Sequence, residues 1–285
     1  MNTTAQSDVL QTAQVHFTPT GHALRVFGMR RSGNHGIINW VQRNIDTGET
    51  VFLNNCRFGD PLIMFQSVTH AKGTSERRIL NVDNHPKMRT AIAQWNTAEH
   101  HIVSYENLTL TEVLTDPTTP SGRYSEDVSW QNILIYRRFL NWLASYLKLM
   151  QKKKSHPYRH ILRDALWRYK AALKEIDMAS DSHIIPILYD NWATDASYRM
   201  DCLNRINLPC VDNSLGEIAR FGGGSSFSSE GQNSEEVVHA ERWAEFVENG
   251  RFHKILNTVL EDKEFYTLIE KHFPDDITIA REIVT

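Results

Sequence analysis

The segment from residue 28 to residue 36, GMRRSGNHG, combines residue types that bind phosphate or another anion. It follows the short apolar run LRVFGM and precedes apolar residues at helical spacing, so it is expected to join a strand to a helix. Glycines in such a turn let backbone N–H groups converge on an anion at the helix N-terminus. Arg30 and Arg31 add positive charge, and an arginine can donate two parallel hydrogen bonds to a phosphate. The sequence therefore predicts an anion site, although a strand–helix turn with two solvated arginines has the same pattern.

The spacing of Gly28 and Gly33 matches the first half of a Walker phosphate loop, but the second half differs. Asn34 and His35 stand where such a loop has a lysine and a hydroxyl residue. Kinases and ATPases need that lysine for the terminal phosphates and that hydroxyl for magnesium. The loop therefore predicts phosphate binding without an obligatory metal. A P-loop kinase that has lost its usual lysine is the alternative within the enzymes.

A second basic position lies at the end of another expected strand, the continuous apolar run at residues 133–136. Arg137 follows this run, and Ser145 lies two helical turns further along the chain. Because ligands of open α/β sheets bind beyond the carboxyl ends of the strands, Arg137 is expected to face the binding crevice. The hydroxyl of Ser145 is suited to the same phosphate. The alternative is an arginine at a helix start and a small serine packed between helices.

Together the two segments resemble the P-loop sulfotransferases, which use 3′-phosphoadenosine-5′-phosphosulfate (PAPS) as sulfo donor. That family has a basic residue followed by Ser-Gly in its first loop, and an arginine followed eight residues later by a serine. This chain reproduces the first pattern from Arg31 to Gly33 and the second with Arg137 and Ser145. The resemblance implies a site for the 5′-phosphosulfate and the 3′-phosphate of PAPS, made of Arg30, Arg31, Ser32, Gly33, Asn34, His35, Gly36, Arg137 and Ser145.

The first loop is more similar to sulfotransferases with Arg-Arg-Ser-Gly-Asn-His than to the cytosolic enzymes with Lys-Ser-Gly-Thr-Thr. Arg31 replaces the usual lysine, and Asn34 and His35 replace two hydroxyl residues. Gly36 stands where the cytosolic enzymes have a tryptophan against adenine, and Trp40 follows one turn later. The loop type implies a carbohydrate-type enzyme whose acceptor is a hydroxyl group on a saccharide.

Sulfo transfer to an alcohol is a displacement that requires a base near the acceptor oxygen. In the family this base follows a strand between the two phosphate-binding segments, and Glu106 is the first candidate here. His85 is the second candidate, because histidine titrates near neutral pH. His35 is a candidate for stabilising the charge on the bridging oxygen. The structural alternatives are a surface ion pair for Glu106 and a turn histidine for His85.

A late glycine-rich segment at residues 221–227 is the last candidate cofactor contact. The family closes a late loop over the 3′-phosphate, which implies a role for Gly223, Gly224 and Ser225. Arg220, just before them, supplies a basic residue of the kind that this loop often has. A linker without a binding role is the alternative.

Composition is that of an ordinary soluble enzyme. The chain has 285 residues, of which 41% are hydrophobic and 23% charged, and a formal net charge of −3. This charge gives no global sign of nucleic-acid binding, and no apolar stretch reaches the ~18 residues of a membrane span. The three cysteines, Cys56, Cys202 and Cys210, indicate no disulfide framework, so a cytoplasmic location is expected. No metal is expected.

Alternating strand and helix patterns predict an α/β fold, a P-loop NTPase-like three-layer sandwich with a central parallel sheet and extra C-terminal helices. Strands are expected at residues 24–29, 50–53, 78–82, 102–105, 133–136 and 184–189. Pro186 weakens the last strand or places it at a sheet edge. Residues 1–20 are expected to be a loose leader, and residues 21–285 a single sulfotransferase-like domain with insertions near 54–100 and 110–130.

These observations predict an enzyme that moves the sulfo group of PAPS to an acceptor hydroxyl by in-line displacement. A non-catalytic nucleotide-binding module on the same fold is the alternative from outside the enzymes. No nucleic-acid partner is expected. The identity of the acceptor and the oligomeric state stay open.

Overall fold

The computed structural model describes residues 17–73, 75–80, 92–116, 124–153, 158–179, 184–216 and 241–285. Its strands form one seven-stranded sheet in the order β4-β3-β2-β5-β1-β6-β7. The bounds are β1 (Ala23–Gly28), β2 (Glu49–Asn54), β3 (Ser67–Lys72), β4 (Ser75–Leu80), β5 (His100–Glu106), β6 (Trp130–Tyr136) and β7 (Ile184–Leu188). Each strand that the sequence predicts is present, with its ends shifted by a few residues.

The sheet is mostly parallel, with an antiparallel part at one edge. β2 is parallel to β5, and β6 is parallel to β7. β3 is antiparallel to both β2 and β4. The sequence did not predict β3, because its residues SVTHAK contain no continuous apolar run. β7 lies at the sheet edge, which is one of the two outcomes that Pro186 predicts. The α/β class and the largely parallel central sheet are confirmed.

The chain divides into two compact units. The first consists of Met1–Arg25, Thr47–Ser104 and Thr111–Trp130, and it contains most of the two segments expected to be insertions. The second consists of Val26–Asp46, Tyr105–Leu110 and Gln131–Thr285. A single sulfotransferase-like domain with insertions stays a prediction.

The first unit is built on the meander from β2 to β4 and on β5 as far as Ser104. The side chains of β5 are buried along nearly its whole length, and His101 within it is fully buried. Arg25 and Trp130 are the last residues of the first and third chain segments of this unit. The guanidinium of Arg25 stacks on the ring of Trp130 at 4.5 Å from the ring centroid. The short helix α3 (Leu110–Thr115) follows β5 and begins at the boundary of the two units.

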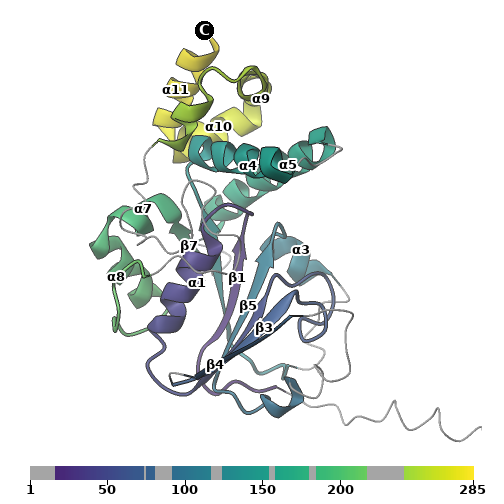
Figure 1. The fold of residues 1–285 in the computed structure, drawn as a ribbon, viewed down its shortest axis with the longest axis vertical. Helices are drawn as coiled ribbons and strands as arrows, with labels where there is room; N and C mark the ends of the chain where they lie inside the picture. Colours follow the sequence, from purple (N-terminus) through teal and green to yellow (C-terminus); the bar gives the residue numbers. More distant parts are fainter. Residues whose placement is uncertain are drawn as a thin grey trace, which may run out of the picture. The chain divides into compact units, whose positions relative to one another are not determined.

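The second unit holds the remaining helices and an extensive apolar core. The helices are α1 (Asn34–Arg43), α4 (Phe139–Lys153), α5 (Tyr158–Asp177), α7 (Tyr189–Thr194), α8 (Ala196–Arg205), α9 (Gly250–Glu261), α10 (Lys263–His272) and α11 (Pro274–Val284), with the 3₁₀ helix η1 (Arg242–Phe246). The apolar faces of α4 and α5 pack with those of the last three helices into one core cluster. Figure 1 shows α9, α10 and α11 gathered beside α4 and α5, so the extra C-terminal helices are confirmed.

Local sequence explains where these C-terminal helices begin. The side chain of Asn249 accepts hydrogen bonds from two N–H groups in the first turn of α9. Asp262 caps α10 through the N–H of Phe265, and α11 begins at Pro274, whose ring suits the first helical position.

Among the described residues, no helix has both the length and the apolar character needed to cross a membrane.

Candidate functional site

The loop between β1 and α1 is tight and depends on glycine. Arg31 and Gly33 both adopt left-handed backbone conformations, with φ of 77° and 91°. A Cβ atom on Gly33 would lie 2.0 Å from the ring of Tyr189, so no larger residue fits there. The left-handed conformation of Arg31 is uncommon for a residue with a side chain and is typical of functional loops. The loop therefore has a defined shape at the N-terminus of α1.

Asn34 closes this loop from inside. Its side-chain N–H₂ donates to the carbonyl oxygens of Gly28 and Met29, both at 3.3 Å. A Cβ on Gly28 would lie 2.2 Å from the amide oxygen of Asn34, so glycine at position 28 makes room for this side chain. Asn34 is therefore used within the loop. By contrast, the hydroxyl of Ser32 is completely buried and has no hydrogen-bond partner among the described residues.

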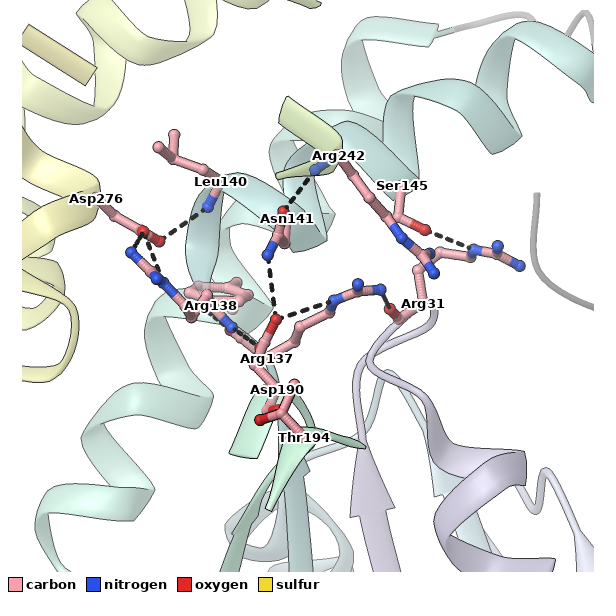
Figure 2. A network of polar contacts seen from close by, with 11 residues as sticks. Arg31, Arg137, Arg138, Leu140, Asn141, Ser145, Asp190, Thr194, Arg242 and Asp276 are labelled. Carbon is pink, nitrogen blue, oxygen red and sulfur yellow. Dashed lines mark hydrogen bonds and ion pairs between the residues drawn. The ribbon is translucent and has the colours of Figure 1, made fainter. Parts of the chain in front are cut away.

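The two basic segments chosen from the sequence are in direct contact. The Nε of Arg31 donates to the hydroxyl of Ser145 at 3.2 Å, across 114 positions of sequence. Nη1 of Arg137 donates to the carbonyl oxygen of Arg31 at 3.4 Å. β6 carries Arg137 just beyond its last residue, and α4 presents Ser145. The loop after β1 and the turn after β6 thus meet at one place, as Figure 2 shows.

A third arginine joins them that the sequence analysis missed. Arg242, the first residue of η1, is only 7% exposed, and Figure 2 shows its side chain directed toward those of Arg31 and Arg137. Burial, followed by the positive charges of Arg137 and Arg31, lowers the pKa of Arg242 to about 10. Burial and the charge of Arg137 also lower the pKa of Arg31. Three like charges crowded in this way favour an anion between them.

Arg137 is the most buried member of this arginine cluster of Arg31, Arg137 and Arg242. Its side chain is 2% exposed and stacks on the ring of Tyr189 at 4.8 Å. Its Nε lies 3.8 Å from a carboxylate oxygen of Asp190, and its Nη2 has no hydrogen-bond partner among the described residues. A buried guanidinium N–H without a partner is costly, and an anion would satisfy it.

Glu106, the last residue of β5, lies against the same loop. Its carboxylate is 3.6 Å from Nε of Arg30 and 3.7 Å from Nε2 of His35. The next residue, Asn107, has φ of 60°, donates its N–H to the Gly28 carbonyl and accepts from the Arg30 N–H at 3.0 Å. The structure therefore brings the first base candidate together with two loop residues chosen from the sequence.

Other candidates are separate from this cluster or lie outside the described residues. Gly36 is approached by the ring of Trp192 at 3.5 Å, measured from the position of its absent Cβ. Trp40 is fully buried in edge contact with Trp192. Tyr189 and Trp192 approach Gly33 and Gly36, and the indole N–H of Trp142 donates to the carbonyl oxygen of Arg30 at 3.1 Å. Outside the described residues lie the second base candidate, the late glycine-rich segment and the basic residue before it: His85, Arg220, Gly223, Gly224 and Ser225.

Arg138 has a different role from its neighbour Arg137. Its Nη2 and Nε donate to Asp276 in the first turn of α11, at 2.6 and 3.0 Å.

In the described part of the chain, no group of three or more His, Cys, Asp and Glu side chains is arranged to hold a metal ion.

Comparison with known proteins supports the fold. No protein-family model and no curated protein matches this sequence. Among solved structures, the chain is similar to that of the mouse sulfotransferase SULT7A1 complexed with PAP, with a TM-score of 0.50 and 12% sequence identity. The similarity covers 89% of this chain and 90% of that chain. At this identity the likeness shows the fold alone: the chain has the P-loop NTPase-like α/β fold of a sulfotransferase, as the sequence predicts.

Proposed function

We propose that this chain is a PAPS-dependent sulfotransferase that transfers a sulfo group to a hydroxyl group of a carbohydrate acceptor. The observation that carries the proposal is the arginine cluster beside the loop after β1. The likeness in fold between this chain and a sulfotransferase complexed with PAP supports the same assignment. The carbohydrate acceptor rests on the type of loop and on a glutamate as base, and a cytoplasmic location stays a prediction based on three free cysteines.

The groups in the site fit a nucleotide with two separate anionic groups. Three guanidinium groups lie near the carboxylates of Asp190 and Glu106, so positive charge is in excess among the described residues of the cluster. The buried hydroxyl of Ser32 and Nη2 of Arg137 have no partners among the described residues. Phosphate oxygens accept hydrogen bonds from such donors. This donor set fits PAPS, which has phosphate at both the 5′ and the 3′ position.

The proposed contacts divide by position. Arg31, Ser32 and the backbone from Gly33 onward bind the 5′-phosphosulfate at the N-terminus of α1. Arg137 and Ser145 bind the 3′-phosphate, and Arg242 joins them from η1. The proposed contacts of Gly36 and of the late-loop residues Gly223, Gly224 and Ser225 stay predictions.

The reacting side of the site is formed by Glu106 and its neighbours. PAPS, when bound, supplies a sulfo group whose transfer to an oxygen nucleophile leaves the 5′-phosphate behind. Glu106 accepts the proton of the acceptor hydroxyl, and Arg30 and His35 hold its carboxylate next to the loop. His35 is proposed to stabilise negative charge on the departing phosphate oxygen. His85 stays the alternative base.

Ligand-dependent stability tests this proposal. We would measure the melting temperature of the full chain without metal, in the presence of adenosine 3′,5′-bisphosphate (PAP), ADP, or ATP with magnesium. A ligand at a hundred times its dissociation constant adds about 2.7 kcal/mol of stability, which is readily detected. We expect selective stabilisation by PAP. A response only to ATP with magnesium would refute the proposal in favour of a kinase-like enzyme.

A matched variant separates an enzyme from a binding module. If PAP binds but substituting Glu106 changes no activity with any saccharide acceptor, the non-catalytic alternative is favoured.

A second variant tests the 3′-phosphate site. Arg137→Ala should weaken the binding of PAP more than the binding of adenosine 5′-phosphosulfate, which lacks the 3′-phosphate. Equal losses for the two ligands would remove Arg137 from the 3′-phosphate site.

A further inference from the structure

A chain of hydrogen bonds behind the arginine cluster connects three segments of the second unit. One carboxylate oxygen of Asp190 accepts from the backbone N–H of Arg138 at 2.8 Å, and the other accepts from the side-chain amide of Asn141 at 3.1 Å. The carbonyl oxygen of that same Asn141 side chain accepts from the backbone N–H of Arg242 at 2.9 Å. Asn141 therefore links the residue that faces Arg137 to the residue that begins η1 (Figure 2).

This series of hydrogen bonds is largely buried. The Asn141 side chain is buried, and that of Asp190 is 13% exposed. Because the Asn141 amide donates at one end and accepts at the other, exchanging the two ends by rotation would break both bonds. Asp190 in turn is the carboxylate nearest to Nε of Arg137, at 3.8 Å. The amide of Asn141 and the carboxylate of Asp190 thus both contact the surroundings of two of the three arginines, in addition to the contacts of Arg137 with Tyr189 and the Arg31 carbonyl.

We propose that Asn141 and Asp190 are positioning residues that hold Arg137 and Arg242 for the 3′-phosphate and so set the selectivity of the site for 3′-phosphorylated nucleotides. This inference rests on the proposed function. Neither side chain is assigned a contact with the nucleotide. Asp190 orients the guanidinium of Arg137, and Asn141 fixes the backbone from which Arg242 projects. A nucleotide without a 3′-phosphate does not use either arginine in this way and is expected to be insensitive to the pair.

The test compares two nucleotides that differ only in the 3′-phosphate. Isothermal titration calorimetry on the full chain would give the dissociation constants of PAP and of adenosine 5′-monophosphate. We expect Asn141→Ala to lower the preference for PAP about tenfold, the effect of one lost hydrogen bond in a charged site, with the affinity for the monophosphate nearly unchanged. The same fractional loss for both nucleotides would overturn the inference, because a merely structural role weakens both.

Asp190→Asn is a second variant, for which a positioning role and a purely electrostatic role predict opposite changes in PAP affinity. The substitution keeps the size of the side chain and removes a negative charge next to Arg137. If Asp190 acted only through its charge, its removal would tighten the binding of PAP, whose two phosphate groups are both anionic. A positioning role predicts weaker PAP binding and a lower preference over the monophosphate. Tighter PAP binding would overturn the inference, and this variant decides the question if Asn141→Ala does not fold.

A matched control is available in the same unit. Asn44, at the C-terminal end of α1, is also buried and also bridges two segments, since it donates to the carbonyl of Asp212 and accepts from the N–H groups of Val211 and Asp212. It is separated from the loop by the length of α1, about 15 Å. Asn44→Ala should lower the melting temperature and leave the nucleotide preference unchanged. The same loss of preference in this control would overturn the inference.

The wild-type protein separates failure of the inference from failure of the proposed function. If the wild type binds PAP and the monophosphate equally, the proposed 3′-phosphate site is wrong and the inference falls with it. If the wild type prefers PAP and both variants keep that preference, the inference alone is wrong.

Discussion

Single residues at this site act through the groups that surround them. Glu106 is the last residue of a buried strand, and its carboxylate lies between Arg30 and His35. The side chain is 14% exposed, so the carboxylate proposed as the base is partly open to solvent while Arg30 and His35 lie beside it. Asn107 anchors the end of this strand to the loop, because its backbone N–H donates to the Gly28 carbonyl and its side-chain oxygen accepts from the Arg30 N–H.

Replacement of this carboxylate tests its role as base. Glu106→Gln is expected to reduce turnover ~10²-fold or more, because the amide cannot accept the acceptor proton. PAP affinity should be nearly unchanged, because the arginine cluster is intact. Turnover is measured as PAP released from PAPS with a saccharide acceptor, and affinity by calorimetry. Full activity of this variant would transfer the role of base to His85 or His35.

At the scale of elements, the last helix is joined to the turn that carries Arg137. Asp276, in the first turn of α11, is 1% exposed and accepts hydrogen bonds from the guanidinium of Arg138 and the N–H of Leu140. Burial raises the pKa of Asp276, against the lowering effect of Arg138 and of the Leu140 N–H. The C-terminal helices thus support the start of α4, directly after the residue proposed to bind the 3′-phosphate.

Breaking this contact is expected to destabilise the chain. Asp276→Ala should lower the free energy of unfolding by about 2 kcal/mol, less than for a fully buried pair because the Arg138 side chain is 35% exposed. Asp275→Ala is the matched control, since its side chain is 81% exposed and lies 3.8 Å from the same guanidinium. The control should change stability by less than about 0.5 kcal/mol in urea unfolding. Equal effects would contradict a structural role for Asp276.

At the scale of the whole molecule, acid stability is expected to depend on one buried histidine. His101 lies in β5, is fully buried and has its Nδ1 2.9 Å from the hydroxyl of Tyr124. Burial lowers its pKa to about 4, from 6.5 for an unperturbed histidine. Between these values the unfolded chain binds a proton that the folded chain does not. The free energy of unfolding therefore falls as the pH decreases from about 6.5 to about 4.

Protonation of His101 is expected to lower the free energy of unfolding by roughly 3 kcal/mol between pH 6.5 and pH 4. Urea unfolding at several pH values would measure it in the wild type and in His101→Gln, which has no group that titrates there. The variant should be less stable at pH 7 but show a smaller decrease toward acid. His160→Gln, at an exposed position of α5, is the control and should keep the wild-type pH dependence. A wild-type slope in His101→Gln would contradict the assignment.

Local patterns were sufficient for most elements and for part of the site. The apolar runs before Arg30 and Arg137 identified β1 and β6, and the glycines and arginines after the first run identified the loop. β3 was missed because Ser67, Thr69 and His70 interrupt its apolar pattern, although Val68 is fully buried. Its strand conformation depends on pairing with β2 and β4, which no local pattern encodes.

The sequence by itself determined which residue types could bind an anion and where strands would carry them, because strand and helix periodicity and glycine turns are local properties. The tertiary structure alone decided that Arg31 meets Ser145 and that Arg242 joins them, because these contacts are made across more than a hundred positions. It also separated Arg137 from Arg138: adjacent residues leave a strand end in different directions, one toward Asp190 and the other toward Asp276. Packing, rather than residue type, makes one a candidate ligand and the other a structural support.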